Sequence, residues 1–383
     1  MIRNILLLEV RNFKEKEMKV VIISNIPSPY RVDFFQYLQD MEYDVFIIYA
    51  AKHVKNRKWK INTEKLGKTY FLKSVGLYLR KSDRNIFFSY GIVNILKQLK
   101  PDVVIGMEYN PTVLQAAWYC DLKRIPYISW TDGTSVSEGN LNILQKWSRR
   151  YIIHMAGAYI ASSTKAKELQ LSYGADKDKS FISYLTVDTS EIDEYQEREI
   201  IKRHNQMICV GSLIPRKGID LLLNALKYVT ADYHLVLIGE GEERKRLSVQ
   251  ARKLGIAEKI TFTGFLDKEE LYQWYAESEL FILTTREDCF ALVILEALAF
   301  GLPVICSKFA DGVYDLVEDG ENGIVIDPYQ AKQTAEAIDT MLKSDELKSR
   351  MTRKSKLKLE KFTFEACAKG VWDAVFCALE EKK

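Results

Sequence analysis

The stretch TREDCFALVILEALAFGLPVICS (residues 285–307) indicates a polar loop, a helix and a short apolar strand in succession. A Gly-Leu-Pro sequence ends the helix in the way helices commonly end, and the strand follows at 304–306. Two acidic residues, Asp288 and Glu296, stand eight apart across the junction of loop and helix. Free amide groups at a helix start attract phosphate, and carboxylates accept hydrogen bonds from hydroxyl groups. The stretch therefore suits a ligand that carries both phosphate and sugar hydroxyls.

Short β-branched runs alternate with helix-period segments on both sides of this stretch. Near-continuous apolar strands separated by helices are typical of parallel sheets buried on both faces. The strands predicted in the first half are Val20–Ser24, Val45–Tyr49, Val103–Gly106, Tyr127–Trp130, Tyr159–Ala161 and Phe181–Tyr184, with helices such as Tyr90–Leu99 and Leu141–His154 between them. The strands predicted in the second half are Met207–Val210, His234–Ile238, Ile260–Thr263, Leu280–Leu283, Val304–Cys306 and Ile324–Ile326. The predicted fold class is α/β, with two doubly wound, Rossmann-like domains facing a cleft and ligands beyond the carboxyl ends of strands.

Chain length supports the same division, because 383 residues exceed what one hydrophobic core usually supports. The predicted parts are an N-terminal extension at 1–17, a first domain at 18–189, a charged linker at 190–206, a second domain at 207–360 and a C-terminal helix at 361–383. The last segment has apolar residues at helical spacing. We expect it to cross back and pack against the first domain, with Trp372 and Phe376 as anchors.

Composition narrows the class of protein. A formal net charge of +3 is too small to indicate nucleic acid as a partner. The six cysteines form no Cys-x-x-Cys pair and only four histidines are present, which argues against a metal site and predicts a reducing compartment. The apolar run at 5–8 is too short for a signal peptide, and no apolar stretch approaches the length of a membrane span. The predicted location is the cytoplasm.

The loop Gly211–Gly218, with the sequence GSLIPRKG, follows a predicted strand and carries two adjacent cations, Arg216 and Lys217. A planar guanidinium and an ammonium, beside a glycine that lets the backbone approach, suit a diphosphate. The alternative is an ordinary surface loop that happens to hold an Arg-Lys pair.

The acidic pair also has two interpretations. If Phe290, Ala291 and Leu292 open the helix, their amide groups point outward with partial positive charge. In the alternative, Asp288 is an N-cap and Glu296 is a solvated helix residue. Glu296, however, lies within the apolar segment ALVILEALAF, where a carboxylate needs a partner or a ligand.

Taken together, the two motifs resemble retaining glycosyltransferase family 4. The spacing of the acids is similar to the family's Glu-x7-Glu signature, with Asp288 in place of the first Glu, while the competing Glu287 is off by one. The cationic loop is similar to the family's G-x-L-x-x-x-K-G element, with Ser212 where many members have Arg. The resemblance implies the two-domain fold called GT-B, with an acceptor-binding first domain at 18–189 and a second domain at 207–360 that binds a nucleoside-diphosphate sugar donor. It also implies retention at the anomeric carbon without an obligatory metal or other cofactor.

Roles for individual residues follow from the resemblance. Lys217 and Arg216 would stabilise the leaving diphosphate, Asp288 would bind a hydroxyl of the donated sugar, and Glu296 would bind the ribose hydroxyls. Asp132 stands where many members have a His that contacts the donor sugar, although Asp132-Gly133 could equally be a simple turn. The donor-binding candidates are Gly211, Ser212, Gly239, Phe265, Cys289, Phe290, Ala291, Leu292 and Glu296, and the acceptor-binding candidates are Pro29, Tyr30, Arg31 and Tyr109.

The implied activity is transfer of a hexose-type sugar to a hydroxyl of a glycan or lipid-linked acceptor, in bacterial cell-surface polysaccharide biosynthesis. A nucleotide-sugar epimerase of the same fold is one alternative. A non-catalytic partner subunit is the other, motivated by the departures at Asp132, Ser212 and Asp288.

Basic and aromatic residues gather in three stretches of the first domain, at 51–60, 71–84 and 144–151. Such mixtures suit an anionic bilayer surface, here the inner face of the cell membrane, because each nearby cation contributes about 1 kcal/mol. Solvated helix faces explain charge runs equally often.

Overall fold

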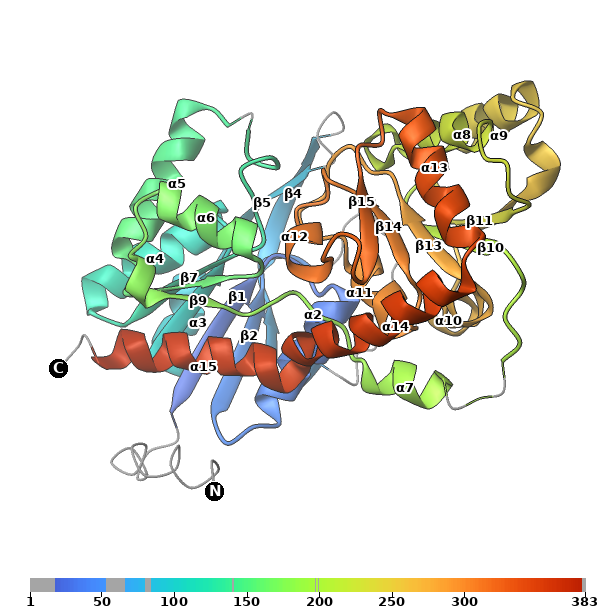
Figure 1. Ribbon diagram of the computed structural model, residues 1–383. Helices are drawn as coiled ribbons and strands as arrows, with labels where there is room; N and C mark the ends of the chain where they lie inside the picture. The colour runs from blue at the N-terminus through green and yellow to red at the C-terminus, as the bar shows by residue number, and fades with distance from the viewer. Residues whose placement is uncertain are drawn as a thin grey trace, which may run out of the picture.

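The computed structural model describes residues 18–52, 66–79, 84–139, 141–196, 198 and 200–380. The predicted extension at 1–17 lies outside the described residues, as do 53–60 and 80–83 of two predicted basic stretches. The described residues form two α/β domains, each built around a parallel sheet (Figure 1). Among them, no helix combines the length and apolarity needed to cross a bilayer.

The first domain contains a seven-stranded sheet in the order β3-β2-β1-β6-β7-β8-β9, and every pair in it is parallel. Its strands are β1 (Lys19–Ser24), β2 (Asp44–Tyr49), β3 (Thr69–Phe71), β6 (Val103–Met107), β7 (Tyr127–Thr131), β8 (Ala158–Ala161) and β9 (Ser180–Ile182). Its helices are α2 (Pro29–Gln39), α3 (Ile92–Leu99), α4 (Pro111–Lys123), α5 (Ile143–Met155) and α6 (Thr164–Ser172). An antiparallel hairpin, β4 (Lys73–Leu79) and β5 (Arg84–Tyr90), lies outside this sheet.

The second domain contains a six-stranded parallel sheet in the order β12-β11-β10-β13-β14-β15. Its strands are β10 (Gln206–Val210), β11 (His234–Ile238), β12 (Ile260–Gly264), β13 (Leu280–Leu283), β14 (Val304–Ser307) and β15 (Gly323–Ile326). Its helices are α8 (Ile219–Leu226), α9 (Arg244–Lys253), α10 (Lys268–Glu277), α11 (Leu292–Ala299), α12 (Val313–Leu316), α13 (Ala331–Leu342) and α14 (Asp345–Leu359). In both sheets the strand order reverses beside the first strand, and such switch points are where ligands bind in open α/β sheets.

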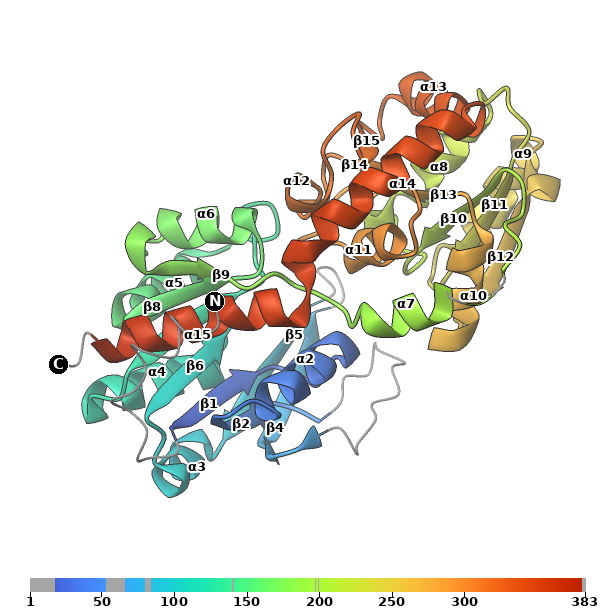
Figure 2. The ribbon, with the colours of Figure 1, turned by 60° about the horizontal axis from the view of Figure 1, so that its bottom comes forward.

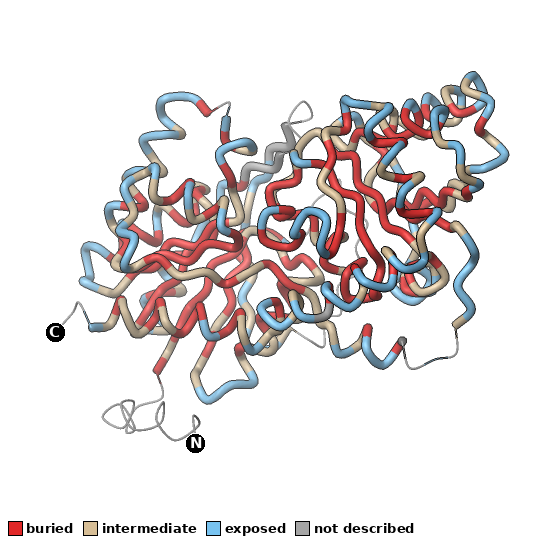
Figure 3. Tube along the Cα trace, in the orientation of Figure 1, coloured by how far each residue is buried: buried red, intermediate tan, exposed pale blue. Residues whose placement is uncertain are grey.

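Burial explains why the strand pattern was visible in the sequence. The central strands of both domains are buried along almost their whole length, and helices cover them (Figure 3). Each predicted strand is present, with bounds that differ by one or two residues at most. Strand β3 and the hairpin were not predicted. Tyr90, predicted to begin a helix, ends β5 instead, because Gly91 adopts a φ of 94° and separates the strand from α3.

The segment predicted as a linker is partly ordered on the second domain. It begins with α7 (Ser190–Gln196), whose Ile192 and Tyr195 are buried in the second domain's core. The segment predicted as the linker at 190–206 therefore contains a helix in its first seven residues.

The C-terminal helix crosses between domains as predicted. α14 packs on α11 and α13 of the second domain, and the chain then bends at 360–362. α15 (Phe364–Glu380) runs along the first-domain sheet, against β7, β8 and β9 (Figure 2). Its Trp372 ring centroid lies 4.5 Å from that of Tyr43, and its Phe376 ring contacts the same Tyr43 at 6.1 Å. This arrangement confirms the predicted fold class.

Candidate functional site

The two motifs of the second domain meet at the point where its sheet order reverses. The loop Gly211–Gly218 follows β10, and the loop 284–291 follows the adjacent strand β13. The Thr284 hydroxyl donates to the Gly218 carbonyl at 3.0 Å. Parallel neighbouring strands therefore bring together two segments that lie about seventy residues apart in the chain.

Glycines permit the close approach of backbones in this region. Gly218 has a φ of 64°, and a Cβ there would lie 2.1 Å from the Thr284 carbonyl oxygen. Gly239, after β11, has a φ of 137°, and a Cβ there would lie 2.0 Å from the Gly211 carbonyl oxygen. Gly211 and Gly239, predicted as donor contacts, thus touch each other through their backbones. Only glycine fits where left-handed backbone and such contacts coincide.

Asp288 is the common partner of the cationic loop and the helix entrance. The Lys217 ammonium donates to its carboxylate, and Arg216 Nη1 lies 3.7 Å from the same oxygen. The other carboxylate oxygen accepts from the Ala291 amide at 3.1 Å and the Phe290 amide at 3.4 Å. Burial alone would raise the pKa of Asp288, but Lys217 and then Arg216 hold it below its usual value, so the group is ionised.

The helix entrance differs from the prediction. α11 begins at Leu292, its N-cap is Ala291 in the left-handed conformation with a φ of 59°, and Phe290 precedes both. The prediction that Phe290 and Ala291 open the helix is therefore wrong, because Asp288 draws their amides into a turn. The alternative that Asp288 is the N-cap is also wrong, since it lies three residues before Ala291.

Glu296 lies in an apolar helix and has found a partner. Its residue is half-buried, and its carboxyl group is surrounded by protein, so desolvation raises its pKa. The Tyr275 hydroxyl donates to Glu296 Oε2 at 2.9 Å, and the Tyr275 ring stacks on Phe300 at 5.3 Å. The interpretation of Glu296 as a solvated helix residue is therefore wrong.

The other donor candidates line the same end of the sheet with less specific contacts. Phe265 is an exposed ring directly after β12, and Ser212 is half-buried beside Gly211. Leu292 is half-buried and packs against the second-domain core. Cys289 is half-buried, and burial raises the pKa of its thiol to about 12, which leaves it protonated.

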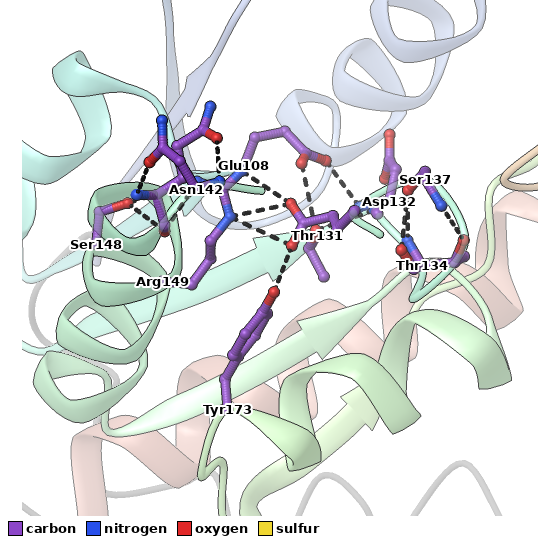
Figure 4. A network of polar contacts seen from close by, with 12 residues as sticks. Glu108, Thr131, Asp132, Thr134, Ser137, Asn142, Ser148, Arg149 and Tyr173 are labelled. Carbon is purple, nitrogen blue, oxygen red and sulfur yellow. Dashed lines mark hydrogen bonds and ion pairs between the residues drawn. The ribbon is translucent and has the colours of Figure 1, made fainter. Parts of the chain in front are cut away.

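A polar network occupies the corresponding end of the first-domain sheet (Figure 4). Asp132 follows β7, and its carboxylate accepts hydrogen bonds from Arg31 and from the Ser162 hydroxyl. Glu108 follows β6 with a φ of 65°, and its Oε1 accepts from the Asp132 amide at 2.8 Å. The Asp132 side chain is thus held by an ion pair, beyond what a simple turn at 132–133 requires.

Among the described residues of this network, none forms an ion pair with Glu108. Desolvation, and then the nearby carboxylates of Asp132 and Glu138, raise the pKa of Glu108 to about 8. Glu138 is paired with Arg149 of α5 at 2.9 Å and accepts from the Tyr173 hydroxyl at 2.9 Å. Glu108 is therefore mostly protonated near neutral pH, while its two acidic neighbours each have an arginine.

Two of the predicted acceptor residues are core residues. Arg31 is 3% exposed, and its guanidinium lies 4.7 Å from the Trp130 ring centroid. Tyr109 is buried, with its ring 6.3 Å from that of Tyr173 and 5.1 Å from the Arg149 guanidinium. Both side chains are thus buried in this arrangement, and their role in acceptor contact stays a prediction.

The other two acceptor candidates lie at the start of α2. Pro29 occupies the first turn of the helix, a position where its missing N–H costs nothing. Tyr30 packs against the core of the second domain and so lies where the two domains touch.

Several hydrogen bonds join the two domains beside these residues. Asp315 of α12 accepts from the Thr164 amide at 2.9 Å, at the start of α6. In the loop that carries Asp132, Thr134 lies beside the Asp311 carboxyl and Ser137 beside the Cys289 thiol, close enough to favour the ionised form of each. The Asp132 loop therefore reaches the residue that directly follows Asp288.

Sequence reasoning assigned no role in the site to Glu108, Ser162, Tyr275 or Arg149. Glu108 had a usable signal, since it is an acid directly after a wholly apolar strand at a switch point. Tyr275 and Arg149 had none, because each reaches its partner from the middle of an amphipathic helix.

Comparisons with known proteins agree with this fold. Residues 30–191 match the family described as Glycosyltransferase Family 4, and residues 191–358 match Glycosyl transferases group 1. An uncharacterized glycosyltransferase of Haemophilus influenzae is 26% identical over 282 residues, which are 71% of this chain and 75% of the relative. The crystal structure of Anabaena Alr3699/HepE in complex with UDP superposes with a TM-score of 0.75 at 17% identity, over 94% of this chain and 99% of that one.

A third similar protein matches a shorter part of the chain. It is the N-acetylgalactosamine-N,N'-diacetylbacillosaminyl-diphospho-undecaprenol 4-alpha-N-acetylgalactosaminyltransferase of Campylobacter jejuni, 25% identical over 201 residues. The match spans 52% of this chain and about half of that relative, 54%. The fold and the site define a glycosyltransferase of the GT-B type. The two families match the two halves of the chain. The chain therefore belongs to the family 4 type of these enzymes.

Proposed function

We propose that this protein transfers a hexose-type sugar from a nucleoside-diphosphate sugar to a hydroxyl of a glycan or lipid-linked acceptor, with retention at the anomeric carbon. The observation that carries the proposal is the convergence of Lys217, Arg216 and the α11 entrance on Asp288. Further support comes from the names of similar proteins, which include a UDP complex and an enzyme named for a diphospho-undecaprenol acceptor. The proposed setting is the cytoplasmic side of bacterial cell-surface polysaccharide synthesis.

Charge separation is the central step of the proposed mechanism. When the bond between the sugar and the diphosphate breaks, negative charge grows on the leaving phosphate. Lys217 and Arg216 lie within reach of one acceptor oxygen, that of Asp288, so a diphosphate beside Asp288 would meet both cations. The acceptor hydroxyl would then attack the anomeric carbon from the face that the diphosphate leaves, and its proton would pass to the departing phosphate oxygen.

No metal ion is needed in this proposal, because two fixed cations supply the positive charge that a divalent ion would otherwise supply. Glu296 would hold the ribose hydroxyls through the carboxylate oxygen that does not accept from Tyr275. Turnover that survives a chelator would agree with the first point, and turnover restored only by a divalent cation would contradict it.

Replacement of Lys217 tests whether Lys217 and Arg216 stabilise the leaving diphosphate. Removing one well-placed charge that stabilises a transition state commonly costs about 2.7–4 kcal/mol, so Lys217→Ala should lower kcat by roughly two to three orders of magnitude. The matched control is Lys259→Ala, which removes an exposed lysine of the same domain from a surface pair with Asp232. The assay measures release of the nucleoside diphosphate from UDP-, GDP- and ADP-sugars in the presence of acceptor.

Near-normal turnover of Lys217→Ala would refute the proposed stabilisation of the diphosphate by Lys217. Analysis of the product separates the alternatives: a new glycoside of retained configuration supports transfer, whereas an epimerised donor without acceptor identifies an epimerase. A purified protein that binds a donor but never turns it over would indicate a non-catalytic partner subunit.

A further inference from the structure

Helices α4 and α5 expose large apolar side chains on the first domain. On α5, Ile143 is 86% exposed, Leu144 77% and Trp147 58%. On the neighbouring α4, Trp118 and Leu122 are also exposed, four residues apart and so on one side of the helix. The two helices pack against each other and lie on the outer side of the domain (Figure 1). Large apolar side chains gathered on two adjoining helices indicate an interaction surface.

The charges on this surface have one predominant sign. α5 contains no acidic residue, and its Lys146 and Arg150 are exposed beside Trp147. The end of α4 adds the exposed Lys123 and Arg124, with Asp121 as an exposed acid nearby. Exposed cations thus lie on the same two helices as the exposed apolar side chains, a combination found in helices that lie in a membrane interface.

We propose that this α4–α5 face docks on an anionic lipid bilayer. The face is defined as Trp118, Leu122, Lys123, Ile143, Leu144, Lys146, Trp147 and Arg150. Its apolar side chains would enter the boundary between headgroups and acyl chains, while the cations remain at the anionic headgroups.

Charge favours a bilayer over a second copy of the chain as the occupant. In a symmetric dimer the same patch meets itself, so Lys146 and Arg150 would face cations of like sign. An anionic membrane surface instead attracts every one of these side chains. Tryptophan is also a side chain that prefers the membrane interface, because one end is apolar and the other polar.

The docking face is physically connected to the proposed acceptor side of the site. Arg149 of α5 lies near the loop that begins at Asp132 (Figure 4), and it is paired with Glu138 of that loop. A bilayer on the α4–α5 face would therefore present a lipid-linked acceptor to the domain that holds Asp132. This step deepens the proposed function and rests on it, whereas bilayer binding itself does not depend on catalysis.

Vesicle flotation of the full chain tests the proposal. The probe is phosphatidylcholine vesicles with about one third phosphatidylglycerol, compared with phosphatidylcholine alone. We expect flotation with the anionic vesicles and its loss at high salt. Because each cation near the surface contributes a factor of about five, Lys146→Gln with Arg150→Gln should weaken partitioning roughly 25-fold. Ile143→Ser with Leu144→Ser should weaken it at least about tenfold.

Matched controls lie elsewhere on the surface. Ile201→Ser changes an equally exposed isoleucine, and Arg353→Gln changes an exposed arginine on α14, so both should float as the unaltered protein does. Circular dichroism establishes that every variant is folded. The proposal is overturned if the unaltered protein fails to float, if the α4–α5 variants float as well as the controls, or if those variants instead dissociate a dimer.

A separate measurement keeps this proposal distinct from the proposed function. The α4–α5 variants should retain turnover toward a water-soluble acceptor while losing flotation. Flotation without any transfer would contradict the proposed function and leave the docking face standing. Transfer without flotation would contradict the docking face and leave the proposed function standing.

Discussion

Glu108 should make the stability of this protein fall as pH rises through neutrality. Its carboxyl group accepts from the Asp132 amide at 2.8 Å and from the Thr131 hydroxyl at 3.3 Å. The carboxylates of Asp132 and Glu138 lie nearby, and the arginines of the network, Arg31 and Arg149, are paired with those two acids. Desolvation first, and this negative surrounding second, raise the pKa of Glu108 to about 8.

The sign follows from proton binding in the two states. In the unfolded chain a glutamate has a pKa of about 4.3, so between about pH 5 and about pH 8 the folded protein holds one proton more than the unfolded chain. The free energy of unfolding should therefore fall by up to about 1.4 kcal/mol per pH unit in this window. The contribution is fully present below the unfolded pKa, is lost as pH rises, and changes no further above the folded pKa.

Glu108→Gln should remove this slope, because the amide keeps the shape and an acceptor for the Asp132 N–H but does not ionise. Urea unfolding, followed by fluorescence from about pH 5.5 to about pH 8.5, gives the free energy of unfolding for both proteins. Above pH 7 we expect the Gln variant to be the more stable. Glu258→Gln, at an exposed glutamate, should keep the original slope. Parallel slopes for the Glu108→Gln and unaltered proteins would refute the assignment of a neutral Glu108.

Two further predictions concern the second domain. Gly218→Ala should reduce the free energy of unfolding by at least about 2 kcal/mol more than Gly255→Ala does. Both glycines have positive φ, but only at Gly218 would a Cβ meet backbone, 2.1 Å from the Thr284 carbonyl oxygen. Equal losses for the two variants in urea unfolding would contradict this contact. Asp288→Asn should lower the free energy of unfolding by about 3 kcal/mol, because it leaves Lys217 without its anionic partner in a mostly buried site. The control Asp232→Asn, in the exposed pair with Lys259, should lower it by less than about 1 kcal/mol. Similar midpoints in thermal unfolding for the two Asn variants would contradict this prediction, because the Lys217–Asp288 pair would then contribute no more to stability than an exposed pair.

The strand framework was predictable because parallel strands covered on both faces must be apolar along their whole length. Val103–Met107 and Leu280–Leu283, for example, are buried at every position. β3 lacked that signal, since it is a three-residue edge strand whose residues are half-buried or exposed. The hairpin of β4 and β5 lacked it too, because Val75 and Phe88, which face each other across it, are both exposed.

The site was predictable to the extent that it depends on strand order. Lys217 and Asp288 could be paired from sequence because both follow strands that a doubly wound sheet places side by side. The start of α11 could not, because it depends on the left-handed Ala291, a conformation that L-residues seldom adopt. The Arg31–Asp132 pair could not either, since it joins side chains 101 residues apart whose directions are set by packing.

The loop after β7 couples the two halves of the proposed reaction. Asp132 begins this loop, Thr134 and Ser137 within it lie beside Asp311 and Cys289 of the second domain, and Glu138 near its end is paired with Arg149. A loop that is held at both ends and in its middle has few conformations to lose, so its position costs little entropy when a substrate binds. The same contacts fix Asp132 relative to the residue next to Asp288. Asp132 of the first domain and Asp288 of the second domain are therefore positioned by a single segment, and a rearrangement of the domains that separated Asp311 from Thr134 would move them apart.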